Sequence, residues 1–151
     1  MQSNRNAQYG ITLLRVMVGI IFVMHGGMKL FGMGFEGVAG FFGSLGIPFP
    51  YANAVFVTLL EVVGGAMLVA GLFTRWVSPL LAVTMVVAIA TVHGPKGFFL
   101  PDGYEFALLL LVTNATLFLT GSGALALDNL IGRAWPQAPA ASSPKRVAQA
   151  A

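Results

Sequence analysis

Long apolar stretches, separated by only a few charged residues, constrain the fold of this chain more than any other feature of its sequence. A single crossing of a bilayer by an α-helix needs about 20 mostly apolar residues. Four segments approach or reach this length, with approximate bounds 11–31, 54–73, 76–93 and 105–119, the last being the shortest. They take up most of the 151 residues, which leaves no room for a separate soluble domain. The sequence therefore predicts an all-α integral membrane protein, built as a four-helix bundle.

The composition agrees with a lipid environment. Hydrophobic residues make up 57% of the chain and charged residues only 9%, whereas soluble domains carry about 25% charged residues. The 19 glycines fit this view, because glycine allows the backbones of transmembrane helices to approach closely. The absence of cysteine excludes thiolate chemistry, iron–sulfur clusters and c-type haem attachment. Any redox role must therefore depend on a bound cofactor, a second substrate or a partner protein.

The basic residues predict the orientation of the bundle. Arg5 precedes the first segment, Arg75 lies between the second and third, and Arg133, Lys145 and Arg146 follow the fourth. Only Lys96 lies in the alternate loops. By the positive-inside rule, both termini and the turn at residues 74–75 are cytoplasmic, and residues 32–53 and 94–103 face outward. We expect a multi-pass protein of the bacterial inner membrane.

The first segment is not expected to be a cleaved signal peptide. It is longer than the apolar region of such peptides and contains Arg15. Its second half contains no small-residue cleavage site, because Gly26 and Gly27 are followed by Met28 and Lys29. We therefore count it as the first membrane span.

Shorter elements are predicted outside the four spans. Apolar residues of the first outer loop recur at helical spacing before Gly46 and Pro48, which predicts a short interfacial or re-entrant helix: Phe35, Val38, Phe41, Phe42 and Leu45. Gly121 and Gly123 should end the fourth helix, and the apolar residues between 125 and 135 suggest a surface-lying turn or two.

The chain divides into three parts on this basis. Residues 1–10 form a cytoplasmic N-terminus, and residues 11–133 form a single four-helix transmembrane domain. Residues 134–151 are rich in Ala, Pro and Ser, and they contain too few apolar side chains to order themselves. We expect this C-terminal tail to be disordered.

Five ionisable residues are expected to meet in the outer half of the membrane: His25, Lys29, Glu61, His93 and Glu105. A charged side chain costs about 2.5–3.5 kcal/mol near the centre of a membrane helix, so each one calls for a partner. Lys29 and Glu61 are the obvious ion pair. With a second carboxylate nearby, we expect protons to be shared within the cluster.

Glycine patterns predict which helix faces pack together. One face of the first helix carries Arg15, Gly19, Phe22, Gly26 and Lys29, and this face should point into the bundle. Gly64 and Gly65 follow Glu61 and should let a neighbouring helix approach the carboxylate.

Arg15 is expected near the inner end of the bundle, apart from the outer cluster. There it could cap carbonyl groups at the C-terminus of the second or fourth helix, or reach Asp128.

A purely structural role for the charged network stays open at this stage. Such a network can serve only to orient the helices, and residues near the membrane boundary can extend into water. Asn114 is expected to make a structural hydrogen bond. A metal site is disfavoured, because no HExxH-type spacing exists and Lys29 would repel the ion. The basic residues are too scattered to form a nucleic-acid-binding surface. We expect the protein to interact with the lipid bilayer instead.

The order and spacing of short motifs from residue 14 to residue 128 resemble the DoxX family. The matching residues are Arg15, Gly19, His25, Gly26, Lys29 and Phe31; Gly46, Ile47 and Pro48; Glu61, Gly64 and Gly65; Gly71, Thr74 and Arg75; His93; Gly103, Tyr104 and Glu105; and Gly121, Gly123 and Asp128. Ala126 departs from the family pattern, in which Ser commonly precedes the Leu and Asp of the C-terminal motif. The resemblance implies a small bacterial four-helix membrane protein of a family mostly assigned as oxidoreductases. Relatives include the DoxD subunit of thiosulfate:quinone oxidoreductase, which implies a link to quinone chemistry.

The leading hypothesis is a quinone-linked oxidoreductase, or a subunit of one. Lys29 or His25 would donate a hydrogen bond to a quinone carbonyl, and Glu61 would carry protons. His93, Glu105 and Arg15 are the candidate substrate-binding residues. No covalent cofactor is expected, so a partner protein or a second substrate would supply the electrons. Two alternatives are a small membrane carrier or proton pathway, and a structural subunit that packs against a larger membrane complex.

Overall fold

The computed structural model describes residues 2–130, and every regular element in this range is helical. The helices are α1 (Gln2–Gly27), α2 (Gly34–Ser44), α3 (Pro50–Leu59), α4 (Gly65–Ala70), α5 (Thr74–Ala88), α6 (Glu105–Thr120) and α7 (Leu127–Leu130). Three π-helical segments continue them, namely η1 (Met28–Met33), η2 (Leu60–Gly64) and η3 (Ile89–His93), and a 3₁₀ turn, η4 (Gly94–Lys96), follows. The predicted all-α membrane fold is confirmed. The predicted disordered tail, 134–151, lies outside the described residues.

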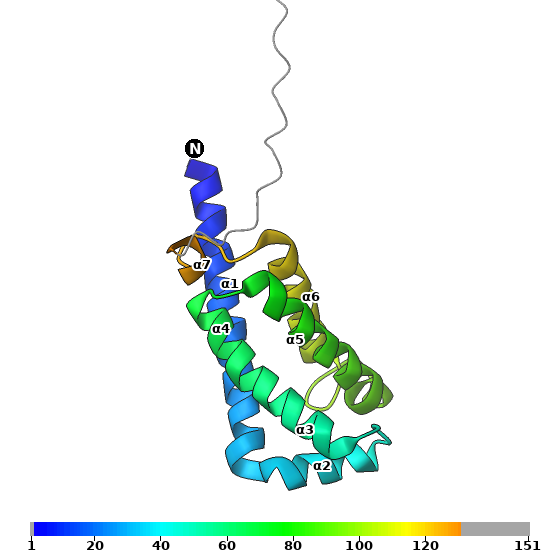
Figure 1. Ribbon diagram of the computed structural model, residues 1–151. Helices are drawn as coiled ribbons and strands as arrows, with labels where there is room; N and C mark the ends of the chain where they lie inside the picture. Colours follow the sequence, from blue (N-terminus) through cyan, green and yellow to red (C-terminus); the bar gives the residue numbers. More distant parts are fainter. Residues whose placement is uncertain (1, 131–151) are drawn as a thin grey trace, which may run out of the picture.

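The helices run back and forth between two ends of an elongated bundle (Figure 1). The start of α1, residues 71–74 and α7 lie at one end, which we call the terminal end. Helix α2 and residues 94–104 lie at the other, which we call the α2 end. The segments α3–η2–α4 return from the α2 end, α5 runs back toward it, and α6 completes the bundle.

Helix α2 crosses the α2 end of the bundle, and it confirms the short helix predicted between the first and second apolar segments (Figure 1). The chain turns into it at Gly34, whose φ of +67° is rarely adopted by residues with a side chain. The helical run before this turn is longer than predicted, because α1 starts at Gln2 and includes most of residues 1–10. Residues 1–10 contain no Pro that would end the helix.

Among residues 2–130, three helical runs are long and apolar enough to cross a membrane: Arg5–Ser44, Pro50–Ala70 and Thr74–Lys96. The fourth apolar helix, α6, has 16 residues. At 1.5 Å per residue it is about 24 Å long, somewhat shorter than the roughly 30 Å hydrocarbon core. The second, third and fourth apolar segments lie within four residues of their predicted bounds, with the fourth the shortest, whereas the first helical run extends well beyond residues 11–31.

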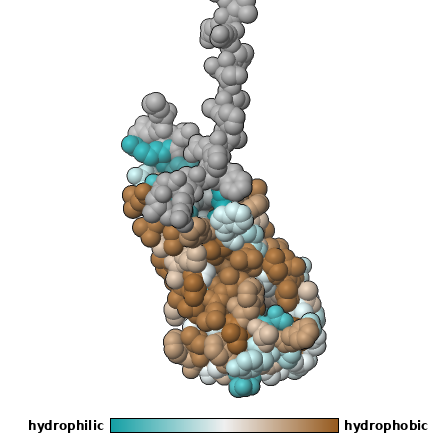
Figure 2. Space-filling model, in the orientation of Figure 1, coloured by the Kyte–Doolittle hydropathy of each residue, from teal (hydrophilic) through white to brown (hydrophobic). Residues whose placement is uncertain are grey.

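The surface has the distribution of polarity that a membrane requires. Figure 2 shows hydrophobic residues over the middle of the bundle and hydrophilic residues near its two ends. Large apolar side chains are widely exposed, among them Leu13, Met24 and Leu119. A soluble protein rarely exposes so continuous an apolar surface, so the middle of the bundle faces lipid.

The closeness of packing differs between the pairs of helices in the bundle. Helix α5 packs along α6, and α1 packs along α4, whereas α1 and α6 meet through a much smaller contact. The close α1–α4 packing depends on Gly19 and Gly65, because a methyl group on either would lie within 2.8 Å of the other's carbonyl oxygen. The core includes Phe22, Leu68 and Leu81.

Candidate functional site

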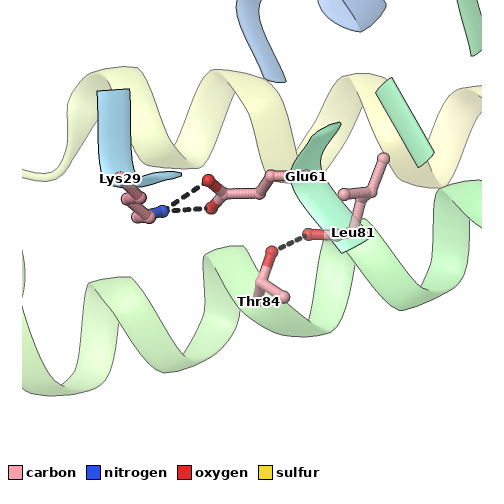
Figure 3. Close-up of polar contacts among 4 residues, drawn as sticks. All are labelled: Lys29, Glu61, Leu81 and Thr84. Carbon is pink, nitrogen blue, oxygen red and sulfur yellow. Dashed lines mark hydrogen bonds and ion pairs between the residues drawn. The ribbon is translucent and has the colours of Figure 1, made fainter. Parts of the chain in front are cut away.

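A buried ion pair joins the first two membrane spans. The Lys29 ammonium lies 2.5 Å from each carboxylate oxygen of Glu61, and Figure 3 shows the two side chains pointing toward each other. The Glu61 side chain is 3% exposed and that of Lys29 is 22% exposed. Glu61 lies near the middle of the span Pro50–Ala70. The predicted ion pair is confirmed, and it lies at a depth where charges are costly.

Each π-helical segment carries one of the candidate ionisable residues. Lys29 is in η1, Glu61 is in η2 and His93 is in η3. A π-helical turn widens the helix and changes the direction of the side chains that follow it. Such turns are rare and are frequently found at functional sites. Nothing in the sequence pattern predicts these three segments.

A glycine contact sets the position of Glu61 relative to α1. A methyl group on Gly26 would lie 2.8 Å from the backbone nitrogen of Val62 and 2.9 Å from Cβ of Glu61. The backbone of α1 therefore lies directly against η2, one helical turn before Lys29. This contact brings the Lys29 side chain within reach of the carboxylate.

We expect Gly26→Ala to lower the free energy of unfolding by about 1–3 kcal/mol, because the added methyl group forces η2 away from α1. Gly27→Ala is the matched control, since nothing lies within 4 Å of a methyl group at this position. It should be neutral or slightly stabilising. Unfolding in mixed detergent and SDS micelles measures both. Equal stability of the two variants would contradict the close contact at Gly26.

His25 lies one helical turn before Lys29 and is exposed on the surface of the bundle. Its ring faces that of Phe106 on α6, with ring centroids 6.2 Å apart and a tilt of 37°. Within residues 2–130, neither ring nitrogen of His25 makes a hydrogen bond. The imidazole is therefore available to a ligand beside the ion pair.

His93 and Glu105 bind backbone groups of residues 94–104 rather than the ion pair. His93 Nδ1 lies 2.9 Å from the carbonyl oxygen of Asp102, and Glu105 Oε1 accepts a 2.8 Å hydrogen bond from the backbone N–H of Leu100. The expected single cluster of five groups is therefore wrong in extent. The reason is local, because both residues flank residues 94–104, whose polar backbone groups are the nearest partners.

Arg15 lies at the terminal end, where it is 1% exposed. Its guanidinium donates a hydrogen bond to the carbonyl oxygen of Leu125, in the segment after α6. It therefore caps neither α4 nor α6, which corrects one of the roles expected for it, and it interacts electrostatically with Asp128. Among the described residues, Nε and Nη1 of Arg15 have no hydrogen-bond partner. Arg15 and the Lys29–Glu61 pair thus form two separate charged sites on α1.

Asp128 organises the terminal end. Its carboxylate accepts hydrogen bonds from the backbone N–H groups of Phe73 and Thr74, at 2.9 and 3.4 Å, and from the hydroxyl of Ser122, at 2.7 Å. A carboxylate at the start of α5 also interacts favourably with the helix dipole. The sequence predicts that Arg15 could reach Asp128, but it does not predict this capping role, because Asp128 is far from Phe73 along the chain.

The remaining polar groups offer no alternative centre in the described part of the chain. No three His, Asp or Glu side chains gather there as a metal site would need. Asn114 is fully buried and donates a hydrogen bond to the carbonyl of Leu110 within its own helix. The Thr84 hydroxyl likewise donates to the carbonyl of Leu81 rather than to the ion pair (Figure 3).

Comparison with known proteins shows similarity over most of the chain. The DoxX family matches residues 10–94. The protein named "Putative oxidoreductase CatD" from Bacillus subtilis (strain 168) is 43% identical over 128 residues, covering 85% of this chain and 91% of that protein. "Inner membrane protein YphA" from Escherichia coli (strain K12) is 31% identical over 130 residues, covering 78% and 87%. No solved structure matches the chain significantly.

Proposed function

Because this chain belongs to the DoxX family of membrane proteins, we propose that it acts as an oxidoreductase, or a subunit of one, that binds a quinone head group beside Lys29 and Glu61. The observation that carries this proposal is the buried ion pair, whose ammonium keeps a partly exposed face next to an unpaired imidazole. The name of the Bacillus subtilis relative supports the oxidoreductase class.

The donors at the site suit a quinone carbonyl. A lysine ammonium has three N–H donors, and Lys29 directs two of its hydrogen bonds to Glu61. The third is free to stabilise the negative charge that develops on a quinone oxygen during reduction. His25 offers a second donor one turn away.

Proton supply is the second requirement. Reduction of a quinone to a quinol consumes two electrons and two protons. Glu61 and His25 are titratable groups next to the proposed head-group position, so they can hold and pass on protons. The paired Lys29 charge keeps the carboxylate in place while it does so.

The electrons come from outside the chain in this proposal. The sequence contains no cysteine for an iron–sulfur cluster or a c-type haem. We therefore assign the donor to a partner protein or to a reduced second substrate, with the quinone as the oxidant. We place the protein in the bacterial inner membrane with both termini in the cytoplasm, on the basis of its Lys and Arg distribution and the name of the Escherichia coli relative.

Binding of menadione, a quinone without a tail, tests the proposal. For protein in lipid nanodiscs, Glu61→Gln and Lys29→Met should each weaken binding about 10- to 100-fold, because each removes charge from a hydrogen-bonded site. Lys96→Met is the matched control, since it removes a lysine whose ion pair with Asp102 is exposed. Mass spectrometry of protein purified in mild detergent should also detect a retained quinone and any stoichiometric partner.

Three results would redirect the proposal. Unchanged binding and unchanged growth under quinone stress in the Glu61→Gln variant would exclude this site. Proton flux into liposomes that disappears in Glu61→Gln would instead favour a proton pathway. A stoichiometric partner whose activity tolerates replacement of His25 and Glu61 would favour a structural subunit.

A further inference from the structure

The seam between α1 and α6 is a much smaller contact than those of α1 with α4 and of α5 with α6. On α1 it carries Leu14, Ile21 and His25, which share one helical face. On α6, Phe106 faces His25, and the exposed Leu109 lies one turn further along the same helix. Leu14 and Leu109 are 50% and 61% exposed. We refer to these five residues as the seam.

The polarity of the seam changes along its length. At one point it presents the His25 imidazole, and Lys29 follows one turn later toward the α2 end. Toward the terminal end it presents only aliphatic side chains, Ile21 and Leu14. An exposed imidazole without a hydrogen-bond partner is unfavourable against hydrocarbon, whereas the aliphatic strip is not. The seam therefore suits a molecule with one polar end and a long apolar remainder.

Phe106 adds a contact for a flat ring. Its side chain is half-buried and faces the His25 ring. Aromatic rings associate through offset or tilted stacking at such distances. A quinone ring that displaces the His25–Phe106 contact would keep an aromatic neighbour and gain the imidazole as a donor.

We propose that the substrate is a membrane-dissolved quinone with an isoprenoid tail, which reaches Lys29 sideways from the bilayer between α1 and α6 and leaves its tail along the seam. This inference rests on the proposed function, because it assumes that the head group binds at the Lys29–Glu61 pair. It adds the substrate class and the route of access. A water-soluble quinone lacks a long apolar tail, so it would make no contact with the aliphatic side chains of Ile21 and Leu14.

A second apolar surface provides a natural comparison. A shallow groove of about 320 Å³ lies between α1 and α4, lined by Ile20, Val23, Met24, Ala66, Val69 and Ala70. On α1 these residues lie on a different face from His25 and Lys29. The close packing at Gly19, Gly26 and Gly65 separates the groove from the ion pair. A tail in this groove could not belong to a head group at Lys29.

The experiment compares two quinones and two variants in lipid nanodiscs. Menaquinone with a four-unit isoprenoid tail and menadione share the naphthoquinone ring, and their affinities are expressed per mole fraction in the lipid to remove partitioning. Leu109→Trp fills the seam, and Met24→Trp fills the groove. Both original side chains are strongly exposed, 61% and 67%, so neither change should disturb the fold. Thermal unfolding verifies this.

The wild-type protein should bind menaquinone about tenfold more tightly than menadione, because the tail removes apolar surface of the seam from lipid contact and orders the head group. Leu109→Trp should abolish this preference and leave menadione binding unchanged. Met24→Trp should change neither affinity. Equal affinity of the wild type for both quinones, or loss of the preference in Met24→Trp alone, would overturn the inference while the proposed function stands. Failure of both quinones to bind the wild type would overturn the proposed function and this inference with it.

Discussion

Glu61→Ala is expected to lower the free energy of unfolding by about 3–5 kcal/mol, since it leaves the largely buried Lys29 ammonium without its counter-charge. The pair is well placed for such an effect, with both carboxylate oxygens bonded to Nζ and the Glu61 side chain 3% exposed. Unfolding in mixed micelles, followed by circular dichroism, measures the loss. We also expect menadione binding to disappear.

The double variant Lys29→Met/Glu61→Met separates structure from function. It removes both charges and replaces them with flexible apolar side chains of similar length, so its stability should return to the wild-type value or exceed it. Quinone binding should stay absent, because no donor or proton carrier remains at the pair. A double variant that binds menadione normally would show that the ion pair only holds the helices together. A single variant with wild-type stability would show that Lys29 reaches water and needs no partner.

Gly71→Ala is expected to cost about 2–6 kcal/mol of stability, from backbone strain and from a steric clash together. Gly71 has a φ of +71°, and a methyl group there would lie 1.6 Å from Nη1 of Arg15 and 2.6 Å from Cβ of Ala126. Its carbonyl oxygen also accepts a hydrogen bond from the backbone N–H of Asp128. The substitution should therefore loosen the whole terminal end.

Gly46→Ala is the matched control for this prediction. Gly46 has nearly the same φ, +73°, but nothing lies within 4 Å of a methyl group at this position. It should lose only the strain energy, about 1–2 kcal/mol. The difference between the two variants, measured by the same unfolding assay, gives the cost of the steric clashes with Arg15 and Ala126. An equal loss in both would mean that Arg15 and Ala126 can move aside at no cost.

The two charged sites of the first membrane span, at Arg15 and at Lys29, differ in how many hydrogen bonds their carboxylate partners accept from other groups. The carboxylate of Asp128 accepts three hydrogen bonds from Phe73, Thr74 and Ser122, so it is occupied in holding the terminal end together. Within residues 2–130, Glu61 is bonded only to Lys29, whose third donor is free and partly exposed. The hydrogen bonds of Asp128 thus hold the terminal end together, whereas the Lys29–Glu61 pair is the position at which we propose that a ligand binds.

Several features follow from the sequence alone, because each depends on short-range rules. A bilayer requires apolar segments of a given length, so the spans, their all-helical character and the helix in the first outer loop are all predictable. A charge inside a span requires a partner, and Glu61 is the predicted partner of Lys29 because the two residues are expected at a similar depth in the membrane. Within residues 2–130, the structure confirms the all-helical character, three helical runs of membrane-spanning length, the helix over residues 34–44 and the ion pair.

Other features depend on how the helices lie relative to one another, which spacing within a single helix does not determine. His93 and Glu105 lie at the predicted end of the bundle, yet loop backbone atoms are closer to them than the ion pair is. Arg15 binds Leu125, and Asp128 caps α5, across large separations in sequence. The π-helical segments and the loose α1–α6 seam also arise from packing, since backbone contacts at Gly19, Gly26 and Gly65 draw α1 toward α4 and away from α6. The sequence by itself therefore determined which residues lie in the membrane, and only the tertiary structure decided which of them meet.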